Sequence, residues 1–147
     1  MNDNIAMIGS RSKLINQLVY FDEELHRFLE VFVQEKSKKS EVEKTVHEYM
    51  EVVERILANF NEESINSVVL IGSTVEVYYL DDHINETFTI VFPYQANPEK
   101  DLISFLSPVG SQLLLAKANQ TYKIKLPFGD TSVIVKKITF TNSALIG

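Results

Sequence analysis

The stretch Leu14–Phe32, LINQLVYFDEELHRFLEVF, decides the first half of the fold because its apolar residues recur with helical spacing. The steps between them are four, three, four, three and four residues, which is the seam of an amphipathic helix. The same steps return over residues 42–60, and neither stretch contains Gly or Pro. The two seams consist of Leu14, Leu18, Phe21, Leu25, Phe28 and Phe32, and of Val42, Val46, Tyr49, Val53, Ile56 and Phe60.

A short polar segment, residues 35–40, joins the two seams. Ser40 and Glu43 have the Ser-x-x-Glu spacing of a capping box, in which the serine oxygen accepts a backbone N–H and the glutamate reaches back to the start of the helix. We therefore expect the second helix to begin at Glu41. A connection this short makes the two helices antiparallel.

Residues 11–61 are thus predicted to form an antiparallel coiled-coil hairpin, preceded by an N-terminal arm at residues 1–10. Pairing the seams symmetrically about Ser37 places Tyr49 opposite Leu25. Further apolar residues lie off the seam, which leaves room for a partner and allows a weak homodimer of the free protein.

Beyond the hairpin the hydrophobic period changes to two, which is typical of half-buried strands. The pattern covers Val75–Tyr79, Phe88–Phe92 and residues 121–126, where each apolar residue is followed by a polar or outward-facing one. Pro127–Asp130 has the composition of a tight turn, so residues 132–140 are predicted to pair back as a hairpin.

One helix interrupts these strands. Ser107 is a favourable N-cap, and Pro108 suits the first helical position because its missing N–H would be unpaired there anyway. The apolar face continues to about Lys117. Residues 65–141 are therefore predicted to form a small, mostly antiparallel sheet with one short helix, which makes the fold class α+β, and residues 142–147 form a tail.

Composition limits the function further. The chain has 147 residues, a formal net charge of −6 and no cysteine, so disulfides, thiolate nucleophiles and cysteine-based zinc sites are excluded. The acidic balance argues against phosphate-backbone binding, and we expect no sequence-specific nucleic-acid recognition. The sequence has neither a signal peptide nor an apolar run long enough to span a bilayer, so we expect a cytoplasmic protein without a membrane partner.

Residues of the types that usually act in catalysis or metal binding form no recognisable motif in this sequence. His26, His47 and His83 lack the additional ligands that a metal site requires. No nucleophile elbow, P-loop or dinucleotide fingerprint is present. We therefore expect no catalytic residues, no metal and no cofactor.

Several motifs, in order, resemble the C-terminal domain of the Gre transcription factors. Gly72–Val75 is similar to the family's G-S-x-V segment, Leu102–Val109 to its I-S-x-x-S-P segment before the helix, and Pro127–Gly129 to its P-x-G turn. Val91–Pro93 and Pro108–Gly110 resemble most closely the branch named regulator of nucleoside diphosphate kinase (Rnk). The resemblance implies an FKBP-like domain preceded by a coiled coil.

The resemblance also implies a mode of action. Gre-type factors dock this domain at the secondary channel of bacterial RNA polymerase and insert the coiled coil toward the active site. In the cleavage factors an acidic D-x-x-E pair at the hairpin tip helps hold a catalytic Mg²⁺, a cation that prefers carboxylate and water oxygens.

This sequence departs from that pattern at the tip, where Lys36, Lys38 and Lys39 stand and the acidic pair is missing. These lysines either attract an anionic partner or only offset the dipole of the first helix. In the docking loop, Leu106 replaces the usual aspartate, whereas Ser107 and Pro108 remain; the three are predicted partner-binding residues by resemblance, and Ser107 and Pro108 have a capping role as well.

Two further departures follow the predicted helix. Leu115 and Asn119 occupy positions where the family usually has glycine, and we expect a remodelled turn there.

The sequence favours a noncatalytic transcription regulator of RNA polymerase. Two alternatives from other classes stay open: a protein–protein adaptor that acts through the hairpin on another partner, and an enzyme, namely a transcript-cleavage elongation factor with an atypical tip. They differ in whether the chain binds polymerase and in whether it shortens transcripts.

Overall fold

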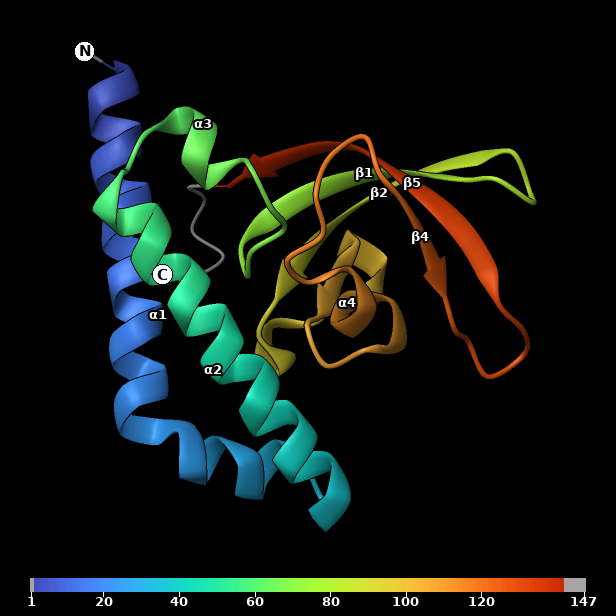
Figure 1. The fold of residues 1–147 in the computed structure, drawn as a ribbon, viewed down its shortest axis with the longest axis horizontal. Coiled ribbons are helices and arrows are strands. Elements are labelled where there is room, and N and C mark those ends of the chain that lie inside the picture. The colour runs from blue at the N-terminus through green and yellow to red at the C-terminus, as the bar shows by residue number, and fades with distance from the viewer. Residues whose placement is uncertain (1, 142–147) are drawn as a thin grey trace. The chain divides into compact units, whose positions relative to one another are not determined.

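The computed structural model describes residues 2–141, with side chains from residue 7 onward. The predicted tail at residues 142–147 lies outside these described residues. The chain divides into two compact units, Met1–Asn61 and Glu62–Gly147. The first unit is helical and the second contains the sheet (Figure 1). The predicted fold class, a helical hairpin followed by a small sheet with a short helix, is confirmed.

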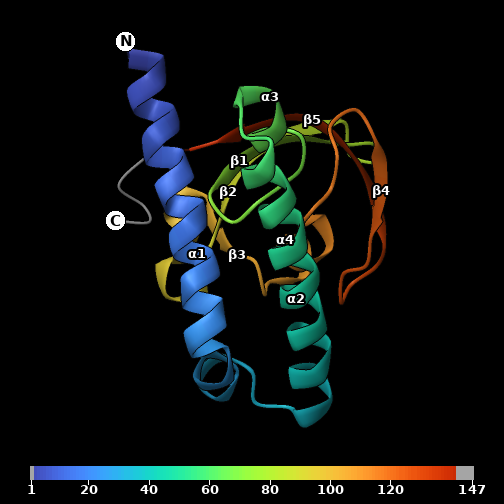
Figure 2. The same cartoon turned by 60° about the vertical axis from the view of Figure 1, so that its left-hand side comes forward.

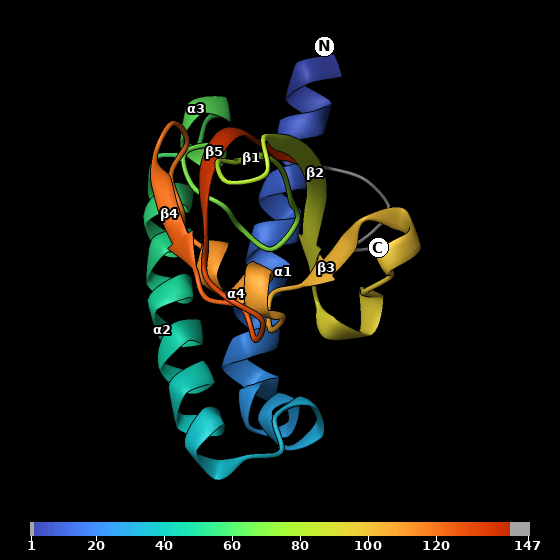
Figure 3. The same ribbon diagram turned by 90° about the vertical axis from the view of Figure 1, so that its right-hand side faces the viewer.

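The first unit is a hairpin of α1 (Asn2–Phe32) and α2 (Lys36–Ala58) (Figure 2). α1 already begins at Asn2, so residues 2–10, predicted as an arm, are helical. Extending an existing helix adds one hydrogen bond for each residue fixed, and Gly9 alone does not stop it. Figures 1 and 3 show that the last turns of α1 leave the axis of its earlier part.

The predicted start of the second helix at Glu41 is wrong. α2 begins at Lys36, and the Lys39 N–H already donates to the Glu35 carbonyl at 2.9 Å. Ser40 therefore lies inside the helix and is exposed, so it caps nothing. No Gly or Pro stops the helix between residues 36 and 40, and the helix extends upstream past the capping pattern.

The seam is buried largely as predicted, but its register is different. Tyr49 packs edge-on against Phe21, with ring centroids 6.2 Å apart, and its hydroxyl donates to Gln17 Oε1 at 2.5 Å. The predicted pairing of Tyr49 with Leu25 is therefore wrong. The cause is the connection, which is only three residues long, so the chain reverses earlier than a turn centred on Ser37 would. The buried seam residues are Leu14, Phe21, Phe28, Val46, Tyr49, Val53 and Ile56.

The second unit is a five-stranded sheet in the order β3-β2-β1-β5-β4, preceded by the short α3 (Glu62–Ile65). Its strands are β1 (Ser73–Tyr79), β2 (Ile84–Val91), β3 (Leu102–Ser104), β4 (Thr121–Ile124) and β5 (Thr131–Phe140). All neighbours are antiparallel except β2 and β3. A β-bulge at Glu76/Val77 shifts the register between β1 and β5, and bulges increase the local twist of a sheet.

β3 is an element that the hydrophobic pattern misses. It has only three residues, and its parallel pairing with β2 follows a connection that contains two short 3₁₀ turns, η1 (Pro93–Gln95) and η2 (Pro98–Lys100). Asp101 then turns the chain with a left-handed backbone, φ +57°. Three residues are too few for alternation to be visible.

The short helix α4 (Pro108–Leu113) lies inside the curve of the sheet, in contact with the edge strands β3 and β4 (Figures 1 and 3). It ends at Leu113, earlier than the predicted Lys117. Leu115 adopts a left-handed backbone with φ +69°. A right-handed α-helix cannot continue through this conformation. Its N–H donates to the Val69 carbonyl at 2.8 Å, outside the helix.

Candidate functional site

The segment that joins β3 to α4 is a tightly bonded loop. It contains Leu106 and Ser107, and the third predicted docking residue, Pro108, is the first residue of α4. The Leu106 N–H donates to Ser104 Oγ at 2.9 Å, and Ser107 Oγ donates to the Ser104 carbonyl at 2.7 Å. Ser107 Oγ also accepts the N–H of Gly110 at 3.0 Å, which confirms the predicted N-cap. Pro108 occupies the first turn and is exposed.

Gly110 allows this loop to pack directly on the helix. A Cβ atom at this position would lie 2.1 Å from the Ser104 carbonyl oxygen and 2.8 Å from Ser107 Oγ. The first distance is far below van der Waals contact and the obstacle is backbone, so no side chain fits without moving the loop. The glycine at position 110 therefore has a steric reason.

An open pocket of about 600 Å³ lies beside the start of α4 within the second unit. Its apolar surface comes from three sources: the sheet, α4 and the loop after β4. The sheet and α4 contribute Tyr79, Phe88, Ile103 and Val109, and the loop contributes Leu126 and Phe128. Of the predicted docking residues, Ser107 and Pro108 line the pocket, whereas Leu106 is half-buried and outside its lining.

Three carboxylates line the same pocket. Asp82, Glu86 and Asp101 line the pocket, and no Lys, Arg or His among the described residues does so. The Tyr79 hydroxyl donates to Glu86 Oε1 at 2.8 Å. Burial, together with this hydrogen bond and the charge of the carboxylate, raises the pKa of Tyr79. The hydroxyl therefore stays protonated and orients Glu86 throughout the physiological pH range.

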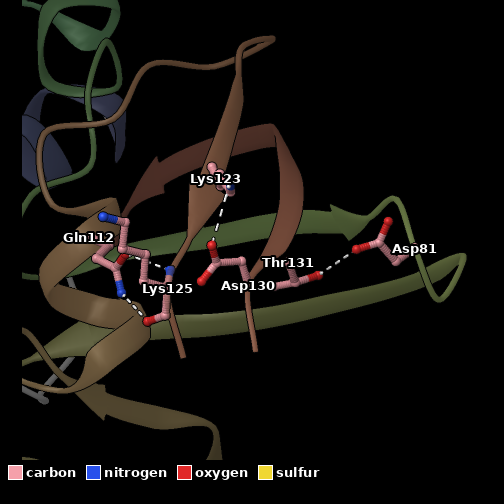
Figure 4. Close-up of polar contacts among 6 residues, drawn as sticks. All are labelled: Asp81, Gln112, Lys123, Lys125, Asp130 and Thr131. Atoms are coloured by element: carbon pink, nitrogen blue, oxygen red, sulfur yellow. Dashed lines mark hydrogen bonds and ion pairs between the residues drawn. The ribbon is translucent and has the colours of Figure 1, made fainter. Parts of the chain in front are cut away.

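Gln112 of α4 holds the loop after β4 in place (Figure 4). Its Nε2 donates to the Lys125 carbonyl at 2.8 Å, and its Oε1 accepts the Lys125 N–H at 2.8 Å, so the side chain imitates a strand neighbour. Across the loop, Lys123 Nζ lies 3.6 Å from Asp130 Oδ2, and Thr131 Oγ1 donates to Asp81 Oδ2 at 3.5 Å. The pocket wall formed by residues 126–128 is thus tied at both ends.

The three predicted tip lysines belong to the other unit. Lys36, Lys38 and Lys39 lie in the first turns of α2, and the first two are exposed. They stand at the positive end of α2, and the last turn of α1 contains no basic residue; that they offset the dipole of the first helix stays a prediction. The first turn of α2 contains no acidic residue.

The described residues contain no group of three or more His, Asp or Glu side chains arranged to hold a metal ion. His26 lies 3.2 Å from Glu30 on the same exposed helix face, as an ordinary i,i+4 pair. Over the same part of the chain, no helix is both long and apolar enough to cross a membrane.

The two positions where the related family usually has glycine keep a glycine-like backbone. Leu115 has φ +69° and Asn119 has φ +64°. Hydrogen bonds hold both: the Leu115 N–H donates to Val69, and the Asn119 N–H donates to Val135 at 2.6 Å. Both residues therefore adopt the left-handed backbone that glycine takes most easily, and this backbone costs Leu115 about 1–2 kcal/mol of strain.

Sequence reasoning missed Phe128, Gln112 and the acidic residues of the pocket. Phe128 could have been found, because a large apolar residue in a Pro-x-Gly turn is expected to be exposed rather than packed in the core. Gln112 had none, because its role depends on where the backbone of Lys125 lies in three dimensions.

The fold and the site define a class: an α+β protein with a helical hairpin followed by a curled mixed sheet that presents an open pocket. The model of the family described as "Transcription elongation factor, GreA/GreB, C-term" matches residues 64–140. This chain therefore belongs to the GreA/GreB family of transcription elongation factors.

Individual relatives give the extent of the similarity. Transcription elongation factor GreA of Nautilia profundicola is 30% identical over 105 residues, 71% of this chain and 65% of that protein. GreA of Chloroflexus aurantiacus is 31% identical over 106 residues, 71% and 68% of the two chains. GreA of Listeria monocytogenes is 40% identical over 77 residues, 52% and 48%. The chain thus spans about half to two thirds of the length of these curated relatives.

Solved structures give weaker overall likenesses. The GreA/GreB elongation factor of Nitrosomonas europaea matches with 28% identity and a TM-score of 0.44, over 51% of this chain and 63% of that one. A structure of the transcription factor Gfh1 matches with 21% identity and a TM-score of 0.46, over 88% and 93%.

Proposed function

We propose that this chain is a noncatalytic regulator that binds bacterial RNA polymerase at its secondary channel. The second unit anchors the protein, and the hairpin enters the channel and obstructs or tunes access. One observation carries the proposal: a C-terminal domain of the GreA/GreB family is joined to a hairpin whose second helix begins with Lys36, Lys38 and Lys39 and which lacks the acidic pair of the cleavage factors.

The docking loop supports the anchoring role. A loop held by hydrogen bonds of 2.7–3.0 Å presents Pro108 to solvent beside an open apolar pocket. Such preorganised surfaces lose little conformational entropy when they bind. Leu106, Ser107 and Pro108 are the residues we assign to contact with polymerase.

The lysines at the start of α2 support the proposal that the chain does not cleave transcripts. Activation of water by Mg²⁺ requires oxygen ligands, usually carboxylates. Lys36, Lys38 and Lys39 offer ammonium groups, which repel a divalent cation and attract anions. The lysines would instead meet acidic or phosphate groups, and their positive charge adds to that of the helix N-terminus.

Equilibrium binding to purified core polymerase tests the anchoring role. We expect saturable binding by the unaltered chain, and binding about tenfold weaker when Leu106→Ser and Pro108→Ala are combined. Tyr94→Ser, an exposed aromatic residue of the same unit outside the pocket, is the matched control and should bind normally. No saturable binding by the unaltered chain at low salt would refute the polymerase proposal and favour an adaptor for another partner.

Backtracked transcription complexes test the absence of chemistry. Addition of the chain with Mg²⁺ should leave transcript length unchanged, while the triple variant Lys36→Glu, Lys38→Glu and Lys39→Glu should still bind polymerase but lose the effect on transcription. Shortened transcripts with the unaltered chain would show that it is a cleavage factor.

A further inference from the structure

The side of α1 that faces away from α2 has an apolar stripe. Gln17 is only 2% exposed and accepts a hydrogen bond from Tyr49, so its side of α1 faces α2 (Figure 2). At 3.6 residues per turn, Ile8, Ile15 and Val19 lie within about 20° of the opposite direction. Ile8 is 66% exposed, Val19 is 49% exposed, and Ile15 is half-buried. The outer side of a surface helix is ordinarily polar, so this stripe indicates an interaction surface.

A groove of about 220 Å³ adjoins the stripe within the first unit. It is lined by Leu18, Val19 and Asp22 of α1 and by Met50 and Glu54 of α2. Leu18 and Met50 are half-buried, so the apolar surface continues from Val19 toward α2. Side chains of a further helix can enter such a groove as knobs enter the holes of a coiled coil.

The charges beside the stripe make this surface complementary to itself. Arg11 and Glu23 are both exposed and lie equally far before and after Gln17 in the sequence. If two copies of α1 pair antiparallel about a two-fold axis at Gln17, Arg11 faces Glu23 of the second copy, and Ile15 faces Val19. Each contact then occurs twice, because a two-fold interface is isologous. Among the described residues, neither Arg11 nor Glu23 makes an ion pair within its own chain.

We infer that two copies of this chain form a weak dimer through antiparallel pairing of the apolar stripe on α1. The interface is small, since a standard interface takes about 20–30 residues from each side, and its dissociation constant is on the order of tens of micromolar. The dimer places a second hairpin alongside the first. If the proposed function holds, only the monomer enters the polymerase channel, and dimerisation regulates how much protein is free to do so.

Exchange of the two charges tests the pairing of Arg11 with Glu23. In sedimentation equilibrium from about 1 to 500 µM, the unaltered full chain should change from monomer to dimer. Arg11→Glu and Glu23→Arg should each weaken association about tenfold, because each places like charges opposite each other twice. The combined exchange should restore association to within about twofold of the unaltered chain. Failure of the combined exchange to restore it would overturn the antiparallel pairing.

A matched pair of changes on α1 tests the stripe itself. Val19→Asp should weaken dimerisation at least about tenfold, because it places a charge in the apolar contact. Val31→Asp is the control, since Val31 is 57% exposed on the same helix but lies outside the stripe. An equal loss of association in both variants would contradict the assigned surface.

Disulfide formation tests the orientation of the two helices, because the chain has no cysteine of its own. The two-fold axis places Ser12 opposite Asp22 of the second copy, and both residues are exposed. A mixture of Ser12→Cys and Asp22→Cys chains should form disulfide-linked heterodimers. Each variant alone should not, because its two cysteines would lie about 15 Å apart along the helices and a disulfide needs Cα atoms within about 7 Å. Cross-linking by either variant alone, without cross-linking in the mixture, would overturn the inference.

The dimer and the polymerase proposal can fail separately. An unaltered chain that stays monomeric up to about 500 µM would overturn the dimer and leave the polymerase proposal intact. A chain that dimerises but does not bind core polymerase would support the dimer and overturn only the polymerase proposal.

Discussion

A sequence pattern typical of helix caps lies near the start of both α2 and α4. Only the pattern at α4 caps its helix. At α4, Ser107 accepts the Gly110 N–H and the helix starts where the pattern predicts. At α2, the pattern of Ser40 and Glu43 lies inside a helix that already started at Lys36.

The difference lies upstream of each serine. The residues before Ser107 pair with β2 as strand β3, and Ser104 bonds to the loop. A helix therefore cannot extend upstream of Ser107. Before Ser40, residues 36–39 are lysines and a serine, with nothing to prevent a helical backbone. A capping pattern therefore predicts a helix start only where the preceding residues are held in another conformation.

Gly110→Ala should disrupt the start of α4. We expect it to produce the largest loss of unfolding free energy among the proposed variants. The added Cβ would meet the Ser104 carbonyl oxygen, and we expect a loss of about 3 kcal/mol in the unfolding free energy of the second unit. Urea unfolding combined with hydrogen exchange at residues 104–113 would measure it. Ser111→Ala, an exposed change one residue away, should cost far less; equal stability of the two variants would contradict the steric argument.

Removal of the two serines compares the starts directly. Ser107→Ala should cost about 1 kcal/mol because it removes the acceptor for the Gly110 N–H. Ser40→Ala should stabilise the hairpin by up to about 0.5 kcal/mol, since alanine is the better residue in a helix interior. The two unfolding free energies are measured against the same unaltered chain. A loss at Ser40 as large as that at Ser107 would mean that Ser40 does cap a helix.

The same reasoning explains how much of the fold could be read from the sequence. Alternation identified β1 and the strand around Ile124, because one face of each meets the core and the other meets solvent. The turn between β4 and β5 followed from the composition of Pro127–Asp130. The helix register did not, because it depends on connection length, and β3 did not, because its pairing with β2 is non-local.

Some residues of the candidate site could likewise be predicted from the sequence, and others could not. Ser107 and Pro108 could be found because capping chemistry is local, and they do line the pocket. Asp101 could not be found, because its place in the pocket lining depends on the two 3₁₀ turns that bring β3 beside β2. The pocket is assembled from three separate stretches of chain, residues 79–88, 98–109 and 126–131, and no spacing in the sequence predicts that they lie together.

The smallest expected effect, at Lys36, depends on the sign of the charge near the start of α2. A lysine in the first turn opposes the helix dipole, so Lys36→Glu should stabilise the hairpin by about 0.5 kcal/mol at low salt, and Lys36→Gln by about half of that. The gain should shrink at high salt, because exposed charges are screened. Had the second helix begun at Glu41, Lys36 would favour the end of the first helix instead, and Lys36→Glu would destabilise. Thermal unfolding of the three chains therefore distinguishes the two helix boundaries by the direction of the shift, even though its size is small.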